Sequence, residues 1–249
     1  MTARATRATT RRVLRQLARD HRTIAMLLVL PALLLTLLWW MFGDTPDPAT
    51  GQPLFDPLGA RLMGLFPMLI MFVITSVTTL RERTSGTMER LMASPASKGD
   101  VVVGYALAFG LVASLQALVL VGYSVFVLGL DINGATWALA LIIVLDALLG
   151  TALGLAASSL ARTEFQAVQM MPAVILPQLL LSGLFMPRSE LPQVLGWVSD
   201  VLPMSYAIDG INHLLAGDTS SIWPQVAILA GFIVASLILG VSTLRRQTA

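Results

Sequence analysis

The sequence predicts an all-α integral membrane protein with six transmembrane helices. Hydrophobic residues make up 56% of the chain and charged residues only 12%, about half the charged share of an ordinary soluble domain. The apolar residues gather in long uncharged runs, and about 20 helical residues suffice to cross a hydrocarbon core of about 30 Å. The basic residues concentrate in alternate connections between these runs, as is typical of a multi-pass protein.

The N-terminal segment, residues 1–22, is predicted to form a basic amphipathic helix. Its arginines are Arg4, Arg7, Arg11, Arg12, Arg15, Arg19 and Arg22, against the single acid Asp20. Apolar residues recur at helical spacing at Val13, Leu14, Leu17 and Ala18. Such a helix lies on an anionic leaflet, where each arginine contributes about 1 kcal/mol of attraction. Because it leads directly into an apolar run, membrane lipid is the expected partner and nucleic acid is not.

Six apolar runs are predicted to be membrane spans, within a single domain formed by residues 1–249. Their expected bounds are 23–42, 62–80, 101–128, 135–160, 165–186 and 222–244. With the N-terminus inside, every basic residue except Arg61 and Arg188 falls in a cytoplasmic connection or at a terminus. The positive-inside rule therefore predicts that both termini are cytoplasmic.

The predicted external connections differ from one another. Residues 43–58 contain several acids and prolines and are expected to form an irregular loop. Residues 188–218 instead keep apolar residues at helical spacing on both sides of Leu202 and Pro203. This pattern predicts two short amphipathic helices that pack against the outer leaflet or dip into it.

A charged segment, residues 82–98, separates the second and third spans on the cytoplasmic side. A short helix is predicted in it, beginning near Gly86 and Thr87 and ending at Pro95. Since this segment faces the cytoplasm, it is where a soluble protein could act on the membrane domain.

The short helix carries an apolar stripe of Met88, Leu91 and Met92, at positions i, i+3 and i+4, with Glu89 and Arg90 turned away from it. Two interpretations follow from this pattern. The stripe either dips into lipid or binds a groove in a soluble partner, for which flexible methionines are well suited. Composition alone favours lipid.

Enzymatic chemistry is not expected of this chain. Lys98 is the only lysine, and no glycine-rich loop that cradles phosphates surrounds it, so ATP hydrolysis requires another polypeptide. The absence of cysteine excludes disulfides and cysteine-ligated metals, and no bound cofactor or metal is expected. An intramembrane serine protease would need Ser182 and His213, but His213 falls in an external segment.

Asp146 is the one acid deep inside a predicted span. A carboxylate at mid-bilayer costs about 2.5–3.5 kcal/mol on insertion scales, so Asp146 should face a helix interface or a wet cavity. It is either the cation or proton site of a coupled carrier or a structural acid, and the lack of an intramembrane basic partner favours the second. Gly150, Gly154 and Ser158 form a small-xxx-small ridge on the same helix, which predicts close packing within or between subunits.

The fifth predicted span contains further polar candidates for a translocation path, Gln169 and Gln178. Glutamines in spans more often form hydrogen bonds between helices. Pro172 and Pro177 interrupt the same span and free backbone carbonyls that need partners or water. The span is therefore either a movable, cavity-lining helix or a kinked one.

Two motifs stand out in this layout. The first has the form E-R-x-x-G-T-x-E-R-L-x-x-S-P and consists of Glu82, Arg83, Gly86, Thr87, Glu89, Arg90, Leu91, Ser94 and Pro95. The second follows the fifth span as SGLFMP, LP and LPMSYAIDG, with Ser182, Gly183, Leu184, Phe185, Pro187, Leu191, Pro192, Leu202, Pro203, Tyr206, Ala207, Asp209 and Gly210. With both motifs at this spacing, essentially the whole chain resembles an ABC type-2 export permease, the membrane subunit of bacterial exporters of the daunorubicin-resistance kind.

The resemblance implies roles for three segments. Residues 1–22 would be the family's interfacial elbow helix, residues 82–98 the loop that couples to an ATP-binding subunit, and residues 188–218 the external re-entrant helices. The coupling residues would be Glu82, Arg83, Gly86, Thr87, Met88, Glu89, Arg90, Leu91, Met92 and Pro95. The external motif residues would be Pro187, Pro192, Pro203, Tyr206 and Asp209.

The resemblance also implies an assembly in the bacterial plasma membrane. Two permease copies, identical or related, would pair with two ATPase subunits that hold ATP and Mg, and spans one, two and five of each copy would flank the route of an amphiphilic drug, antibiotic, lipid or lipid-linked glycan. Tyr105 and Asn212 depart from the family pattern, where lysine and arginine are common. An ion- or proton-coupled carrier centred on Asp146 and a non-transporting scaffold remain the alternatives.

Overall fold

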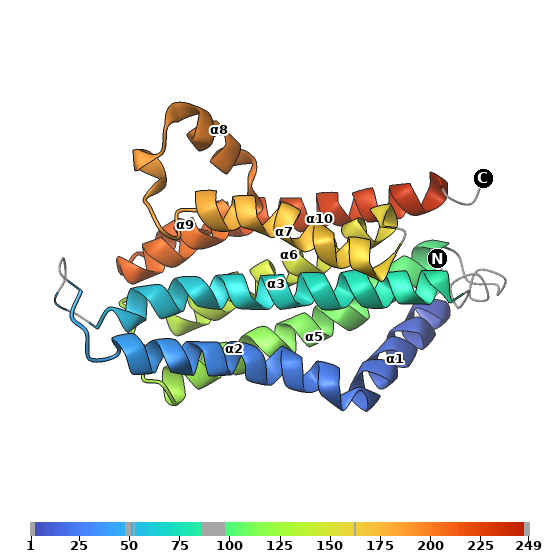
Figure 1. The fold of residues 1–249 in the computed structure, drawn as a ribbon, viewed down its shortest axis with the longest axis horizontal. Helices are drawn as coiled ribbons and strands as arrows, with labels where there is room; N and C mark the ends of the chain where they lie inside the picture. Colours follow the sequence, from blue (N-terminus) through green and yellow to red (C-terminus); the bar gives the residue numbers. More distant parts are fainter. Residues whose placement is uncertain (1–2, 48–50, 52, 86–97, 162, 247–249) are drawn as a thin grey trace.

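The computed structural model describes residues 3–47, 51, 53–85, 98–161 and 163–246. Within these ranges the regular structure is helical, which confirms the all-α prediction (Figure 1). The elements are α1 (Ala3–Arg19), α2 (His21–Phe42), α3 (Phe55–Thr84), α5 (Lys98–Phe126), α6 (Thr136–Leu160), α7 (Glu164–Leu181), η1 (Arg188–Glu190), α8 (Gln193–Val201), α9 (Pro203–Leu215), η2 (Ser220–Ile222) and α10 (Trp223–Arg246).

Five of the described helices are long and apolar enough to cross a membrane, and the protein is therefore a multi-pass membrane protein. They span His21–Phe42, Phe55–Thr84, Gly99–Phe126, Thr136–Leu160 and Ser220–Gly240. The predicted fifth span, 165–186, corresponds to the shorter α7, which is not among them. Helix α7 ends at Leu181, and the chain then turns at Gly183, whose φ of +91° favours glycine.

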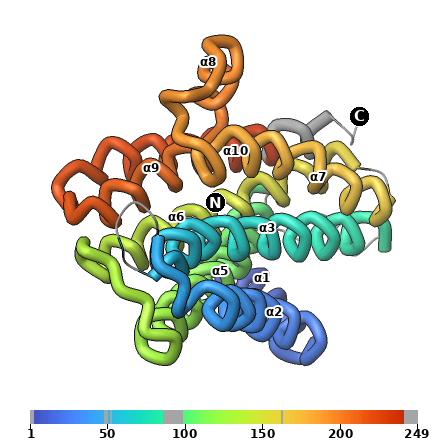
Figure 2. Tube along the Cα trace, turned by 60° about the vertical axis from the view of Figure 1, so that its left-hand side comes forward, coloured from blue at the N-terminus to red at the C-terminus, as the bar shows by residue number. Residues whose placement is uncertain are grey.

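The long helices run side by side, with α3 and α6 at the centre of the bundle (Figures 1 and 2). Helix α1 lies at an angle to them and packs against α5. The start of α1, the end of α10 and the end of α3 all lie at one end of the bundle in Figure 1. The last described residues before the predicted coupling segment therefore lie at that end.

The N-terminal helix is shorter than predicted. Helix α1 ends at Arg19 and α2 begins at His21, because Asp20 caps the start of α2. The Asp20 carboxylate accepts hydrogen bonds from the Thr23 backbone N–H at 3.1 Å and from its hydroxyl at 2.7 Å. These bonds, the side-chain one above all, lower the pKa of Asp20. The first membrane helix thus starts two residues before the predicted 23.

Helix α3 begins earlier than the predicted bound of 62, so the end of the 43–58 loop is helical. It starts at Phe55 and includes Asp56 and Arg61. Both charges have partners: Asp56 accepts the Asp131 backbone N–H at 3.2 Å, and the Arg61 Nε donates to the Asn212 side-chain oxygen at 2.9 Å. A helix whose terminal charges are paired can extend beyond the uncharged run that hydropathy detects.

The small-residue ridge of α6 packs within the subunit, against α3. A Cβ atom built on Gly150 would collide with the Met68 carbonyl, and one on Gly154 would lie 2.6 Å from the Phe72 carbonyl oxygen. The two helices therefore approach closely because these positions lack side chains. This answers the question that the sequence left open between packing within and between subunits.

The substitution Gly150→Ala is expected to lower the stability of the folded protein by about 1–3 kcal/mol, because the added methyl group must push α3 and α6 apart. Gly231→Ala in α10 is the matched control, since its Cβ would meet no atom within 4 Å. Thermal unfolding of both variants in one detergent measures the difference. Equal midpoints for the two variants would contradict the close approach.

The two predicted external helices are present as α8 and α9. Proline starts each element here: Pro187 precedes η1, Pro192 precedes α8, and Pro203 occupies the first turn of α9. Helix α9 inserts into the bundle with Met204, Ile208 and Ile211 fully buried. Helix α8 stands away from the bundle and exposes most of its apolar residues (Figure 1).

Candidate functional site

The candidate site lies where α3 ends and the predicted coupling loop begins. Glu82 and Arg83 lie in the last turn of α3. The other predicted coupling residues, Gly86, Thr87, Met88, Glu89, Arg90, Leu91, Met92 and Pro95, lie outside the described residues. The structure therefore describes the helix end to which that loop is attached.

Three consecutive charged residues, Arg81, Glu82 and Arg83, directly precede Thr84, the last residue of α3. Successive residues of a helix point about 100° apart, so the three side chains leave α3 in different directions. Each reaches a different neighbour, and together they connect this turn to α1, α5, α6 and α7. We call these three residues and their partners the α3 junction.

Glu82 is the buried centre of the α3 junction, with 4% of its surface exposed. Its Oε2 accepts a hydrogen bond from the Arg12 Nη2 of α1 at 2.7 Å and another from the Tyr105 hydroxyl of α5. The same Arg12 nitrogen donates to the Tyr105 oxygen at 2.6 Å, and the guanidinium lies 5.8 Å from the centre of the tyrosine ring. Glu82 thus holds the N-terminal helix and the third span on the end of the second.

A buried carboxylate of this kind depends on its partners. Removing one member of a buried ion pair leaves an uncompensated charge, which costs about 3–5 kcal/mol. Tyr105 is 1% exposed and occupies a position where the resemblance led us to expect lysine. The positive charge that neutralises Glu82 here comes instead from Arg12, on a different helix.

The two arginines of the junction reach α6 and α7. Arg83 donates to the Ser158 carbonyl in the last turn of α6, one of the carbonyls that a helix end leaves without an intrahelical partner. Arg81 binds both carboxylate oxygens of Glu164 in the first turn of α7, at 3.0 and 2.9 Å. This second pair is exposed to solvent, so its net contribution is about 0–1 kcal/mol.

Helix α1 is attached to α5 at a second place. The Thr10 hydroxyl donates to the Thr6 carbonyl at 2.9 Å and to the Gly104 carbonyl at 3.1 Å. A Cβ on Gly104 would lie 2.7 Å from the Thr9 Cβ, so glycine is what permits this contact. Both attachments together hold α1 against α5 and the end of α3.

The external motif is organised around Arg188. Its guanidinium donates to the carboxylates of Asp200 and Asp209, its Nε donates to Ser199 Oγ at 2.8 Å, and it lies 5.6 Å from the centre of the Tyr206 ring. Tyr206 in turn donates to the Asp200 carbonyl at 2.6 Å. The partly buried Arg188 therefore holds η1, α8 and α9 together. Burial raises the pKa of Asp209 more than Arg188 lowers it.

The three predicted intramembrane polar residues do not come together. Asp146 is fully buried in α6, where a Cβ on Gly64 of α3 would lie 3.9 Å from its Oδ2. Gln178 is buried in α7, and its Oε1 accepts the Met204 backbone N–H of α9 at 3.2 Å. Gln169 is exposed on α7 beside an open groove of about 450 Å³. The structure thus gives no continuous polar path through these three side chains.

Asp146 has no hydrogen-bond partner for either carboxylate oxygen among the described side chains and backbone. It lies fully buried within the chain beside Gly64 of α3, and a Cβ on that glycine would also lie near Ile208 and Ile211 of α9. The protease hypothesis finds no support, because the buried Ser182 hydroxyl forms no hydrogen bond in the described part of the chain and so none with His213.

Sequence reasoning missed the partners that complete these sites. Arg12 was one of many arginines, Arg81 was a span boundary, and Tyr105 and Asn212 were only departures from a pattern. One signal was available: Arg61 and Arg188 are the two basic residues outside the predicted cytoplasmic pieces, and both have buried or partly buried partners. A basic residue that violates the charge rule is worth examining as a structural anchor.

Comparison with known proteins supports the resemblance. Residues 4–215 match the family model described as ABC-2 type transporter. The chain is 27% identical over 168 residues to the probable multidrug ABC transporter permease YbhS of Escherichia coli. The aligned residues make up 67% of this chain and 44% of that protein. It is 25% identical over 178 residues to ABC transporter G family member 20 of Dictyostelium discoideum. That alignment covers 70% of this chain and 24% of that protein.

The chain therefore spans less than half the length of these two relatives. The family match is different in extent, since it covers most of the chain and includes α1, the α3 junction and the external motif up to the end of α9. This chain belongs to the ABC-2 type transporter family.

Proposed function

We propose that the chain is the transmembrane permease subunit of an ATP-driven ABC exporter. The observation that carries the proposal is the α3 junction. It joins the turn that precedes the predicted coupling loop to four other helices. A displacement of that loop would be transmitted to α1, α5, α6 and α7 by the hydrogen bonds of Glu82, Arg83 and Arg81, in addition to side-chain packing.

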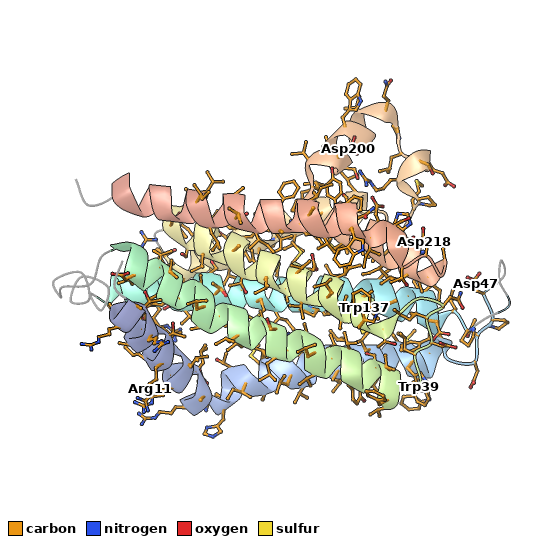
Figure 3. All side chains as sticks on the ribbon, turned by 180° about the vertical axis from the view of Figure 1, so that it is seen from behind. Arg11, Trp39, Asp47, Trp137, Asp200 and Asp218 are labelled. Atoms are coloured by element: carbon orange, nitrogen blue, oxygen red, sulfur yellow. The ribbon has the colours of Figure 1, made fainter. Side chains whose placement is uncertain are left out.

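The proposed topology has six spans, with α7 as the fifth and both termini in the cytoplasm. Figure 3 supports this orientation, since Arg11 lies at one end of the bundle and Asp47, Asp200 and Asp218 lie towards the other. Trp39 and Trp137 also lie towards the acidic end, as expected of tryptophans at a membrane interface. The predicted coupling loop then faces the cytoplasm.

The proposed partners are two ATP-binding subunits, which would hold ATP and Mg, and a second permease copy. The apolar stripe of Met88, Leu91 and Met92 would bind a groove in the ATPase, while Glu89 and Arg90 make polar contacts around it. Closure of the two ATPases on ATP would displace this loop and, through the α3 junction, tilt α3 and α7.

The proposed cargo is amphiphilic: a drug, an antibiotic, a lipid or a lipid-linked glycan, exported across a bacterial plasma membrane. Helices α2, α3 and α7 of two copies would flank its route. The exposed face of α7 supports this, because it combines Val168, Leu176 and Leu180 with the polar Gln169. The name of the Escherichia coli relative refers to multidrug transport by that protein.

The test is co-purification with the ATP-binding subunit, followed by ATP turnover with and without candidate amphiphiles in reconstituted vesicles. The proposal expects a stable complex whose ATP turnover rises with a transported compound. A permease that binds no ATP-binding subunit in detergent or in vesicles would contradict it.

The alternative carrier hypothesis depends on Asp146. Asp146→Asn is expected to leave export within about twofold of the wild type, because asparagine is nearly isosteric and neither carboxylate oxygen has a hydrogen-bond partner among the described residues. Transport in vesicles with and without a proton gradient measures this. A carrier would instead lose gradient-driven transport.

A further inference from the structure

We propose that the groove between α1 and α5 is a specific binding site for one anionic phospholipid of the cytoplasmic leaflet. The groove has an open volume of about 580 Å³, within the range of ligand sites. It is lined on the α1 side by Arg7, Arg11 and Arg15 and on the α5 side by Leu107 and Leu111. The inference rests on the proposed orientation of α1 but not on export.

The headgroup end of the groove is lined by three arginines of α1. Arg7, Arg11 and Arg15 recur every four residues along one face of α1, and all three are exposed. None of them forms an ion pair within the part of the chain that the structure describes. Arg11 points away from the helix bundle in Figure 3. Three uncompensated guanidinium groups at one groove complement the negative charge and the oxygens of a lipid phosphate.

The other face of α1 is already occupied. Val13 and Leu17 are buried against the bundle, and Arg12 binds Glu82. Thr10, which lines the groove, is fixed by its hydrogen bond to the Gly104 carbonyl of α5. The distance between the arginine face and α5 is therefore set by the fold, which makes this a preformed groove with fixed walls.

The apolar end of the groove continues along α5. Leu107 and Leu111 lie in the groove, and Leu115 and Leu118 follow at helical spacing, all at least half exposed. They form a strip that runs from the arginines towards the middle of the membrane. One acyl chain laid on this strip would leave its phosphate beside Arg11 and Arg15. A soluble anion would use only the charged end, so the combination of both ends favours a lipid.

Native mass spectrometry of the purified protein tests the site. The full-length chain is reconstituted in vesicles of equal phosphatidylcholine and phosphatidylglycerol and then extracted gently. One phosphatidylglycerol should remain bound in preference to phosphatidylcholine. The double variant Arg11→Gln/Arg15→Gln should weaken its retention about tenfold or more, since two charge contacts are lost. Arg4→Gln/Arg22→Gln removes the same net charge outside the groove and should retain the lipid.

Two further variants test the apolar end without changing any charge. Leu111→Trp fills the groove and should reduce retention, whereas Ile238→Trp, at a similarly exposed position of α10 that does not line the groove, should not. Equal retention of the two lipids, or equal loss in both arginine double variants, would overturn the proposal. So would displacement of the bound lipid by glycerol phosphate alone, which would indicate a site for a soluble phosphate.

Discussion

Leu91→Asp is expected to leave the protein inserted in the membrane while reducing export about tenfold or more. Helical spacing places Leu91 in the middle of the predicted stripe, between Met88 and Met92. An aspartate there would have to give up its water to enter an apolar groove on the ATPase, and burying an unpaired charge costs well over the roughly 1.4 kcal/mol that corresponds to tenfold. The ATPases would still close on ATP, but their closure would no longer displace the loop and move α3.

Export and ATP turnover should be measured on the same vesicles, because uncoupling predicts that turnover persists after export is lost. Leu91→Met is the matched control, since methionine keeps the apolar contact and should export normally. Membrane fractionation verifies insertion. If Leu91→Asp exported at the wild-type rate, the assigned coupling role of this segment would be wrong.

Arg12→Ala is expected to destabilise the end of the bundle at which α3 ends by about 3 kcal/mol. Glu82 is buried and depends on Arg12 for its compensating charge, so the variant leaves a carboxylate in an apolar site. The side chain of Arg12 is 34% exposed, which places the expected cost at the low end of the range for buried pairs. Helix α1 should detach from α3 and α5 before the rest of the bundle unfolds.

A double-mutant cycle isolates this interaction. The double variant Arg12→Gln/Glu82→Gln should lose less stability than the sum of the losses in the two single variants. The reason is that the double variant leaves no uncompensated charge. Limited trypsin digestion at the α1 arginines reports detachment, and thermal unfolding reports the free-energy change. Tyr105→Phe should cost less, about 1–2 kcal/mol, since it removes the hydroxyl's hydrogen bonds with Glu82 and Arg12 but keeps the ion pair between those two residues. Strict additivity of the two glutamine variants would contradict a direct Arg12–Glu82 coupling.

Hydropathy and proline positions predicted the elements well because both act locally. An uncharged run must be a helix to satisfy its backbone in lipid, and Pro203 can start a helix but cannot continue one. The predicted helices on either side of Leu202 were found for this reason. The predicted start of α3 was wrong because the uncharged run ends at Arg61, whereas the helix continues past it and Asn212, in a remote part of the chain, binds this charge.

The contacts of the site could not be predicted in the same way. Arg12 and Glu82 are 70 residues apart, and Tyr105 and Arg12 are 93 apart. No local period relates them, and an arginine on a helix with many arginines gives no sign of having a buried partner. The resemblance implied a coupling role for Glu82, which stays a prediction, and the structure adds that its side chain is buried against α1 and α5. The motif's first residue therefore binds α1 and α5 from the last turn of α3.

The central claim, that a soluble motor acts on the segment after α3 from inside the cell, is most directly tested by single introduced cysteines, since the chain has none of its own. Leu91→Cys and Trp197→Cys, the latter exposed on α8, are compared in intact cells that also contain the ATP-binding subunit. The account predicts that a thiol crosslinker joins Leu91→Cys to that subunit, while a membrane-impermeant maleimide labels Trp197→Cys and leaves Leu91→Cys unlabelled. Labelling of Leu91→Cys from outside, or crosslinking of the ATP-binding subunit through Trp197→Cys instead, would contradict it.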